Sequence, residues 1–356
     1  MFNLDNFIRR AVKKLVPYRV PNVNCVLKLD AMENPYNLPE DILLEVIKEI
    51  KELKFNRYPD PMCSDLKKII SSNYQIPEEW VIIGNGSDEL ILNLLLAFGR
   101  NENKILYPYP TFEVYGIIAK MLGLKTEEIP LEKNFKLNSQ KFIDYEEDSI
   151  IFISYPNNPT GNCFSQEAIY RIIEESNSLV VIDEAYFGFS DKTFLLDVQR
   201  YPNLIISRTF SKMFSLASLR VGFLCANPGI INVLLKVKLP YNVNSFSQIV
   251  SKVVLSKNSY FKKKTEEIIE ERERIYCFLQ NVEGITAYPS EANFILFKVE
   301  NNQADYVYEK LIKKGILIRS FKNISPISDC LRISMGTKEE NDIFQEKLSQ
   351  ILSKAH

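Results

Sequence analysis

Histidine is nearly absent from this sequence of 356 residues: the only one is His356, the last residue. A histidine-based catalytic triad, a histidine-rich metal site and a histidine general base inside a core are therefore not expected, and we expect no metal ion. Any proton transfer falls to lysine, tyrosine, aspartate or glutamate, because these are the other side chains that act as general acids and bases.

Paired cysteines and long apolar runs are also missing. The six cysteines are scattered and form no Cys-x-x-Cys pair, which is typical of free thiols in a reducing compartment and predicts a cytoplasmic protein. No apolar run reaches the ~18–20 residues of a membrane-spanning helix, so we expect no membrane association. Residues 1–16 form an amphipathic stretch without the apolar core or the cleavage site of a signal peptide.

Neither sign of charge is in excess. The 44 basic and 45 acidic residues give a net charge of −1, which argues against a nucleic-acid partner. Hydrophobic residues make up 46% of the sequence and charged residues 25%, as in an ordinary globular protein. The length suggests two domains, or one large and one small.

What the sequence does contain is a lysine among hydroxyl groups. Residues 207–220 read S-R-T-F-S-K-M-F-S-L-A-S-L-R, and the apolar run before them predicts that a buried strand ends just before Lys212. A lysine at a strand end, where α/β sheets bind ligands, can form a Schiff base with a carbonyl compound or with pyridoxal phosphate (PLP). Thr209, Ser211 and Arg220 are suitable donors for a phosphate. Taken alone, the stretch is more often a solvated basic turn.

Other strand ends carry groups suited to the same ligand. After a strand at 80–84, N-G-S-D-E opens a long apolar helix that Ser87 can cap, so this turn predicts a phosphate cradle. A strand at 149–154 leads into Y-P-N-N-P-T-G, a stiff loop that holds an asparagine amide still. Phe112, which follows a strand at 104–107, either stacks on a flat ring or fills the core.

Asp183 ends a strand at 178–183 whose other residues are so apolar that both faces must be buried. A buried carboxylate needs a cationic partner, because an unpaired buried charge is very costly. That partner is either a protonated pyridine nitrogen or, as a plainer alternative, the cation of a structural salt bridge.

The order of the elements predicts an α/β fold. Strands and helices alternate from 80 to 225, which predicts a mostly parallel sheet flanked by helices. Residues 292–352 alternate again and predict a smaller α+β domain. The predicted domains are an N-terminal arm at 1–37 that packs with the small domain, a large domain at 38–240 and a small C-terminal domain at 241–356. An amphipathic helix is predicted to start at Leu38-Pro39-Glu40, with a stripe of Ile42, Leu43, Val46, Ile47, Ile50 and Leu53.

In this order the motifs resemble those of the fold-type I PLP-dependent enzymes over nearly the whole chain. Within that class the chain resembles the histidinol-phosphate aminotransferase family. The family often has N-E-N-P-x-G near its N-terminus, where this chain has Met32 and Asn37 in place of the first asparagine and the glycine. The shared stretches are K-L-D-A-M-E-N-P-Y, F-N-R-Y-P-D-P, N-G-S-D-E, P-T-F-x-x-Y, Y-P-N-N-P-T-G, R-T-F-S-K-x-F-x-L-A-S-L-R-V-G, E-A-N-F-I and L-R-I-S-M-G-T-x-E-E-N.

The resemblance implies PLP as the cofactor and a role for each matched residue. Lys212 would bind the cofactor covalently and move a proton, and Asp183 would keep the ring nitrogen protonated. The other implied cofactor contacts are Asn158 and Tyr186 at the ring hydroxyl oxygen, Phe112 on the ring face, and Ser87, Asp88, Thr209, Ser211 and Arg220 at the phosphate, with Tyr58 reaching the cofactor of the neighbouring subunit in a homodimer. The implied substrate contacts are Arg332, for the anionic group, with Tyr18, Glu33 and Asn293 nearby.

The resemblance also implies a reaction: L-histidinol phosphate and 2-oxoglutarate give imidazole-acetol phosphate and L-glutamate, in histidine biosynthesis. One pocket must accept both substrates, and a planar guanidinium suits both a carboxylate and a phosphate. Two alternatives of the same fold are an aromatic amino-acid aminotransferase and a threonine-phosphate decarboxylase. A protein kept only for binding or regulation is a third, against which the intact Lys212 and Asp183 argue.

Overall fold

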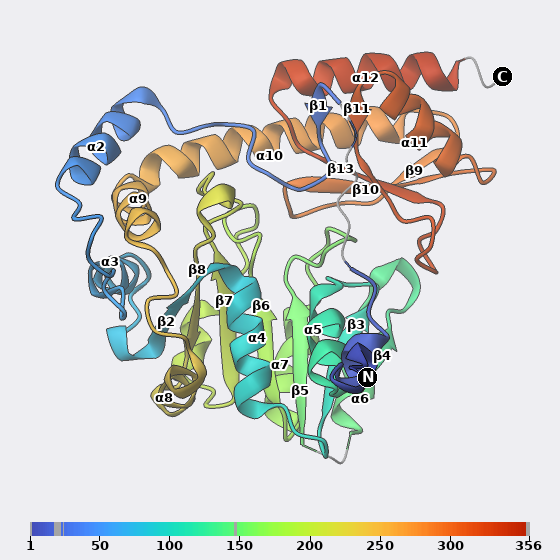
Figure 1. The fold of residues 1–356 in the computed structure, drawn as a ribbon. Coiled ribbons are helices and arrows are strands. Elements are labelled where there is room, and N and C mark those ends of the chain that lie inside the picture. The colour runs from blue at the N-terminus through green and yellow to red at the C-terminus, as the bar shows by residue number, and fades with distance from the viewer. Residues whose placement is uncertain (1, 18–22, 24, 146–147, 354–356) are drawn as a thin grey trace.

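The computed structural model describes residues 2–17, 23, 25–145 and 148–353. These residues form a seven-stranded sheet flanked by helices and a separate four-stranded sheet with helices of its own (Figure 1). The long helix α10 (Asn258–Gln280) runs from the side of the large sheet to the small one. The predicted α/β fold with a smaller α+β part is confirmed.

The large sheet is mostly parallel, as predicted. Its strands lie in the order β2, β8, β7, β6, β5, β3, β4, and only β8 is antiparallel to its neighbours. Because β2 and β7 both run opposite to β8, they run parallel to each other, and their carboxyl ends meet those of β5 and β6 at one edge. In spatial order the strands are β2 (Val81–Gly84), β8 (Gly222–Ala226), β7 (Leu204–Thr209), β6 (Leu179–Asp183), β5 (Ser149–Ser154), β3 (Lys104–Tyr109) and β4 (Lys125–Pro130).

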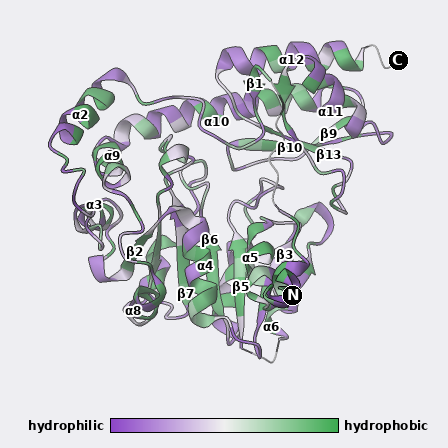
Figure 2. Cartoon of the chain, in the orientation of Figure 1, coloured by the Kyte–Doolittle hydropathy of each residue, from purple (hydrophilic) through white to green (hydrophobic). Residues whose placement is uncertain are grey.

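Alternation of side chains divides the core of the large sheet between its two faces. On β6, Val181 joins the cluster that includes α4, α5 and α8, whereas Val180 and Ile182 join the cluster on the opposite face, which includes α3 and α7. Figure 2 shows the central strands as a hydrophobic band. These five helices are α3 (Ser64–Tyr74), α4 (Gly86–Phe98), α5 (Val114–Leu122), α7 (Gln166–Glu175) and α8 (Pro228–Val237).

Helix α4 begins at Gly86, and its N-cap residue is Asn85. The prediction that Ser87 caps this helix is therefore wrong, because Ser87 lies inside its first turn. Gly86 has a φ of +80°, a conformation that side chains other than glycine rarely adopt. The first-turn N–H groups have no partner within the helix, so the predicted arrangement of strand, glycine turn and helix N-terminus is present.

The small sheet is antiparallel and has the order β12, β13, β10, β9. A separate parallel pair joins β1 of the N-terminal arm to β11, with Leu27 opposite Ile316. The arm therefore lies beside the C-terminal part of the chain, while the domain bounds stay a prediction. The strands are β1 (Leu27–Lys28), β9 (Ile285–Ala287), β10 (Phe294–Val299), β11 (Ile316–Leu317), β12 (Arg319–Ser320) and β13 (Cys330–Ser334), and the accompanying helices are α11 (Ala304–Lys313) and α12 (Lys338–Leu352).

Helix α2 (Glu40–Lys51) buries only part of its predicted apolar stripe. Ile42 and Val46 are buried, but Leu43 is 45% exposed and Ile47 is 41% exposed. Among the described residues, no helix has the length and apolar character that crossing a membrane requires. The other helices are α1 (Arg10–Lys13), α6 (Gln140–Ile143) and α9 (Ser245–Ser256), and the 3-10 turns are η1 (Leu4–Asn6), η2 (Glu78–Trp80), η3 (Lys133–Phe135), η4 (Leu195–Gln199) and η5 (Ala217–Leu219).

Candidate active site

A cavity of about 370 Å³ lies at the carboxyl edge of the large sheet. Strands β5, β6 and β7 end there, so residues that are far apart in the sequence meet in one place. Most of the predicted site residues line this first cavity. They are Glu33, Ser87, Asp88, Phe112, Asn158, Asp183, Tyr186, Thr209, Ser211, Lys212 and Arg220.

Asp183 is the last residue of β6 and is 3% exposed. Its Oδ2 accepts a 2.7 Å hydrogen bond from the hydroxyl of Tyr115, which is fully buried on α5. Its Oδ1 has no hydrogen-bond partner among the described residues. Burial raises the pKa of the Asp183 carboxyl to about 6, against the opposing effect of the Tyr115 hydrogen bond. No salt bridge to Asp183 exists in the described part of the chain, so the plainer alternative is excluded there.

Lys212 follows the end of β7 and is held from the N-terminal arm. Its Nζ donates a 2.9 Å hydrogen bond to the backbone carbonyl of Ala31. The Asn34 side chain donates to the backbone carbonyls of Lys212 and Met213, both at 3.1 Å. Burial, together with the positive charge of Arg332, lowers the pKa of Lys212 to about 8. A fraction of the amine is thus neutral near neutral pH, and the neutral amine is the nucleophile.

The predicted phosphate donors form one hydrogen-bonded group. The Thr209 hydroxyl donates to Ser211 Oγ at 2.9 Å, and Arg220 Nη1 donates to the same oxygen at 3.5 Å. Arg220 Nη2 also bonds to Asp88 Oδ2 at 3.0 Å, in an ion pair with both side chains nearly half exposed. An exposed ion pair of this kind contributes little stability, so the guanidinium can take a different anion at small cost.

Two glycines shape the surface around these donors. A Cβ atom at Gly86 would lie 2.7 Å from Arg220 Nη2, and one at Gly222 would lie 2.7 Å from the backbone N of Ser87. Both glycines are therefore required for the close approach of the β2–α4 turn, β8 and Arg220. The result is a concave surface of N–H groups, hydroxyls and a guanidinium, which suits a phosphate.

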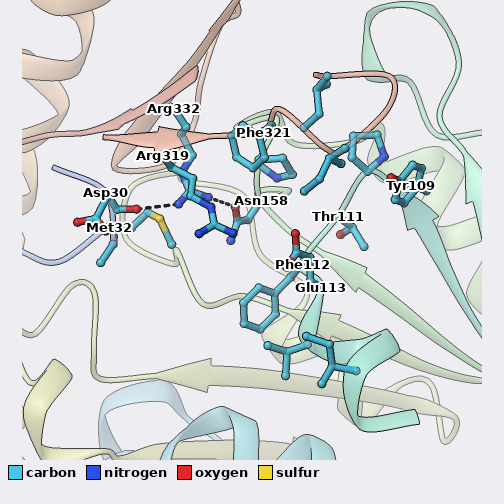
Figure 3. A pocket seen from close by; sticks show the side chains of 17 residues that line it. Asp30, Met32, Tyr109, Thr111, Phe112, Glu113, Asn158, Arg319, Phe321 and Arg332 are labelled. Atoms are coloured by element: carbon cyan, nitrogen blue, oxygen red, sulfur yellow. Dashed lines mark hydrogen bonds between the residues drawn. The ribbon is translucent and has the colours of Figure 1, made fainter. Parts of the chain in front are cut away.

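A second cavity of about 340 Å³ adjoins the first and shares Met32, Phe112 and Asn158 with it (Figure 3). Arg332, on β13 of the small sheet, is 5% exposed and points into the space between the two sheets. Its Nη2 donates to the backbone carbonyl of Asp30 at 2.9 Å, and its Nη1 donates to Asn158 Oδ1. Arg332 is thus bound to the arm on one side and to the Asn158 loop on the other.

Arg319, on β12, lines the second cavity together with Arg332. Its guanidinium forms no hydrogen bond or ion pair with any described residue. Much of the remaining wall is apolar and comes from Phe321, Ile324 and Ile327. A cavity with two cations and an apolar wall suits a ligand that has an anionic end and a flat or apolar end.

The first cavity fits PLP. The Lys212 amine is available to the aldehyde, and the unpartnered, buried Asp183 Oδ1 matches a protonated ring nitrogen. The concave surface beside Arg220 matches the phosphate. Among the described residues, no cluster of His, Cys, Asp and Glu is arranged to hold a metal ion.

Comparison with known proteins identifies the family. The family model described as aminotransferase class I and II matches residues 24–348. A histidinol-phosphate aminotransferase from Caldanaerobacter subterraneus is 38% identical over 353 residues, which is 98% of this chain and 100% of that protein. The chain belongs to the aminotransferase class I and II family. The resemblance that the motifs indicated is therefore confirmed, and this chain is an aminotransferase by family.

Solved structures share the fold of this aminotransferase. The histidinol-phosphate aminotransferase from Sinorhizobium meliloti, in complex with pyridoxal-5'-phosphate, has a TM-score of 0.88 at 20% identity, and the match covers 98% of each chain. An L-threonine-O-3-phosphate decarboxylase from Porphyromonas gingivalis has a TM-score of 0.82 at 18% identity, over 92% of this chain and 100% of that chain. Two different activities thus occur on the fold of this aminotransferase.

Two predicted site residues of the aminotransferase, Tyr58 and Asn293, line neither cavity. Tyr58 is 81% exposed and stacks on Tyr241, with ring centroids 4.5 Å apart. Asn293 is fully buried, and its amide donates a 3.0 Å hydrogen bond to the carbonyl of Met32 instead of lining a cavity. Tyr18 lies outside the described residues.

The structure adds three residues to the aminotransferase site that the sequence analysis did not single out. Tyr115 bonds to Asp183, Asn34 holds the Lys212 loop, and Arg319 lines the second cavity. Tyr115 is the tyrosine of P-T-F-x-x-Y and Asn34 belongs to E-N-P, so both already stood in shared motifs. Arg319 stands in no motif, and its position on a strand end was the only available signal.

Proposed function

We propose that this aminotransferase uses PLP to transfer the amino group of L-histidinol phosphate to 2-oxoglutarate, giving imidazole-acetol phosphate and L-glutamate. This is a step of histidine biosynthesis. The observation that carries the proposal is that Lys212 and the unpartnered Asp183 share one cavity, next to a second cavity that contains Arg319 and Arg332. The relative that is 38% identical over its whole length bears the name of this activity.

When bound, PLP supplies an aldehyde that can bond to an amine. It also supplies a ring that withdraws electrons from the Cα atom next to that amine. Lys212 binds that aldehyde through Nζ and then carries a proton to and from the Cα atom of the substrate, for which its pKa of about 8 is suited. Asp183 Oδ1 keeps the ring nitrogen protonated, while Tyr115 fixes the other carboxylate oxygen.

The remaining cofactor contacts are proposed from their places in the first cavity. Asn158 and Tyr186 donate hydrogen bonds to the ring hydroxyl oxygen, and Phe112 stacks on the ring. The phosphate is held by hydroxyl, guanidinium and backbone N–H groups of Thr209, Ser211, Arg220 and the Ser87–Asp88 turn.

The second cavity gives the substrate end of the site. Arg332 binds the anionic group of each substrate in turn, the phosphate of histidinol phosphate or a carboxylate of glutamate. Arg319 has no other partner among the described residues, and so we assign it to the same anion. The apolar wall around Phe321 receives the imidazole ring. Glu33, which lines the first cavity, is proposed to lie near the substrate amine.

We also propose that the active unit is a homodimer in which Tyr58 reaches the phosphate of the partner's cofactor. Several large apolar side chains, among them Tyr241, which stacks on Tyr58, are exposed in the single chain, and exposed apolar surface is typical of an interface. Sedimentation should give a dimer, and Tyr58→Phe should weaken PLP binding without changing the mass. A monomeric active enzyme would contradict this. The exposed residues are Leu43, Leu44, Ile47, Phe55, Leu239 and Tyr241.

The proposed compartment is the cytoplasm. All six cysteines are free thiols in the structure, and scattered free thiols are typical of a reducing compartment.

Two measurements test the proposed function. Lys212→Ala should still bind PLP, but without a borohydride-reducible bond to the protein and with essentially no transamination; retained turnover would refute the role of Lys212. A substrate panel with the wild-type enzyme should then give the highest kcat/KM for histidinol phosphate. A preference for phenylalanine would favour the aromatic alternative, and CO₂ release from threonine phosphate would favour the decarboxylase.

A further inference from the structure

The turn at residues 290–293 lies between β9 and β10 of the small sheet, and it contacts the two segments that Arg332 bonds to. On one side it touches the Asn157–Gly161 loop that carries Asn158. On the other it touches the N-terminal arm at Met32. This turn belongs to the E-A-N-F-I motif, whose Asn293 was predicted to contact the substrate and lines neither cavity.

Glu291 fastens the turn to the Asn158 loop. Its backbone N–H donates to the carbonyl of Gly161 at 2.7 Å, and its Oε1 accepts from the backbone N–H of Cys163 at 3.3 Å. Its Oε2 lies 2.7 Å from Lys192 Nζ and accepts from the Ser190 hydroxyl at 3.2 Å. Burial acts to raise the pKa of Glu291, but the hydrogen bond and charge of Lys192, together with the bonds from Cys163 and Ser190, lower it overall.

Packing between the turn and the loop is as close as the hydrogen bonds imply. A Cβ atom at Gly161 would lie 2.6 Å from Ser290 Oγ, and Gly161 itself has a φ of +82°. The loop end and the turn therefore move together, because separation would break the Glu291 bonds and rotation is blocked by contact.

Asn293 fastens the turn to the arm. Its side-chain amide donates to the Met32 carbonyl at 3.0 Å, and the Met32 N–H donates to Ser334 Oγ at 2.8 Å. Met32 has a φ of +53°, a left-handed conformation that is unfavourable for a residue other than glycine. The bonds from Asn293 and Ser334 hold Met32 on both sides in this conformation.

Both segments, the Asn158 loop and the N-terminal arm, accept hydrogen bonds from the Arg332 guanidinium. Arg332 Nη1 donates to Asn158 Oδ1, on the loop that Glu291 holds. Arg332 Nη2 donates to the carbonyl of Asp30, two residues before the Met32 that Asn293 holds. Two of the contacts that orient the planar Arg332 fork are therefore these acceptors, beside its contacts with the rings of Phe294 and Phe321. Each acceptor belongs to a segment that one residue of the 290–293 turn holds.

We propose that Glu291 and Asn293 are positioning residues that orient Arg332 through these two acceptors, and that they thereby set the affinity for the anionic group of the substrate. The inference rests on the proposed function, in which Arg332 binds that anion. Neither residue lines either cavity.

The test is binding of glutarate, a dicarboxylate that cannot react, to the PLP-loaded enzyme, measured by calorimetry and expressed per PLP-containing site. Glu291→Ala and Asn293→Ala should each raise the Kd of glutarate about tenfold, because a guanidinium free to rotate loses much of a bidentate contact. Glu291→Gln, which keeps the acceptor oxygen and the shape, should fold normally and have a smaller effect. Glu283→Ala, an exposed change in the same small domain, is the matched control and should leave the Kd unchanged.

The steady-state pattern separates positioning from general damage. KM should rise together for glutamate and histidinol phosphate, while kcat per PLP-containing site changes less than about threefold. The double variant should cost less than the product of the single effects, because both act through one guanidinium. A purely structural role would lower the melting temperature and the PLP content but leave the Kd per site unchanged.

Arg332→Ala in the same titration distinguishes the two proposals. If this variant binds glutarate as tightly as the wild type, the assigned role of Arg332 fails and this inference fails with it. If Arg332→Ala weakens glutarate while Glu291→Ala and Asn293→Ala match the control, the proposed function stands and the positioning role is overturned.

Discussion

Two arginines flank Lys212 in the sequence, and they lie on opposite faces of the large sheet. Arg208 is 4% exposed, forms a two-pronged ion pair with Glu184 at 2.7 and 2.9 Å, and lies against the rings of Tyr74 and Phe187. Arg220 lines the first cavity, and its side chain is 45% exposed. Two arginines close together in the sequence therefore have different places: Arg208 packs within one face of the sheet, and Arg220 lines the cavity on the other.

The alternation of side chains along β6 and β7 explains this division. Asp183 and Thr209 share the face of Val181, over which the first cavity lies, and Glu184 and Arg208 belong to the opposite face. On the cavity face, Asp183 Oδ1 has no hydrogen-bond partner among the described residues, and the ion pair of Arg220 with Asp88 is nearly half exposed. On the opposite face, the buried Arg208 and Glu184 form an ion pair with each other. We expect changes on the first face to alter chemistry and binding and changes on the second to alter stability.

The largest effect should come from Asp183→Asn, on the cavity face. An amide cannot keep the ring nitrogen protonated, so kcat should fall about 10²- to 10⁴-fold, the range for a group that controls a proton in the transition state. Asparagine keeps the shape and can still accept from Tyr115. The urea midpoint should therefore hardly move at about pH 4, where Asp183 is protonated in the folded wild type. Single-turnover kinetics measure the chemical step, and a loss below about tenfold would contradict the role.

Next in size is Arg208→Met, on the opposite face. The variant leaves Glu184 as a buried charge without its cation, which should cost about 3–5 kcal/mol of unfolding free energy. Urea unfolding of the apoprotein measures this loss. Glu184→Gln combined with Arg208→Met should recover most of it, because no buried charge then remains, and an equal loss in the double variant would argue against the ion pair as the cause.

The pH dependence of the unfolding free energy should distinguish the two faces further. The pKa of Asp183 is raised from 3.8 to about 6 in the folded chain, so its stabilisation is fully present below about pH 4 and is lost as the pH rises through about 6. Between about pH 4 and about pH 7, Asp183→Asn apoprotein should therefore gain about 2–3 kcal/mol of unfolding free energy relative to the wild type. A constant difference across this range would show that the carboxyl is not perturbed.

The smallest effect on stability should come from Arg220→Met. Losing a charged hydrogen-bond donor at the phosphate should weaken PLP binding roughly 10- to 100-fold. The apoprotein should lose less than about 1 kcal/mol, because the ion pair with Asp88 is nearly half exposed. Equilibrium dialysis with PLP and urea unfolding measure the two quantities, and a large stability loss would place Arg220 with Arg208 rather than opposite it.

Much of the cavity face could be predicted from the sequence because short segments determine it. The apolar runs that end in Asp183 or lead into Lys212 can be recognised directly in the sequence. The carboxyl ends of parallel strands lie at one edge of a sheet, so these residues were expected to meet there. The placement of Arg208 on the far face was also available, since it alternates with Thr209 on β7. The prediction that Ser87 caps the helix was wrong because the helix already begins at Gly86. Gly86 adopts a left-handed conformation there, which the composition of the turn does not reveal.

The substrate end could not be predicted to the same depth, because contacts between distant segments determine it. Asn293 is a polar residue in a shared motif, and nothing in its neighbours indicates that it holds Met32 rather than a ligand. Arg319 lines the second cavity only because β12 pairs with β13, a register set by the whole small sheet. The exposure of Leu43 and Ile47 on α2 likewise depends on which segments pack against that helix, which the stripe itself does not reveal.

The pairing of Leu27 with Ile316 joins the N-terminal arm to the C-terminal part of the chain. As the chain leaves the ribosome, every strand of the cofactor-binding sheet is available well before Ile316 appears. The arm strand must wait for its partner, and Arg332 follows only sixteen residues after Ile316. Every residue that lines the first cavity has therefore been synthesised before Arg319 and Arg332 of the second.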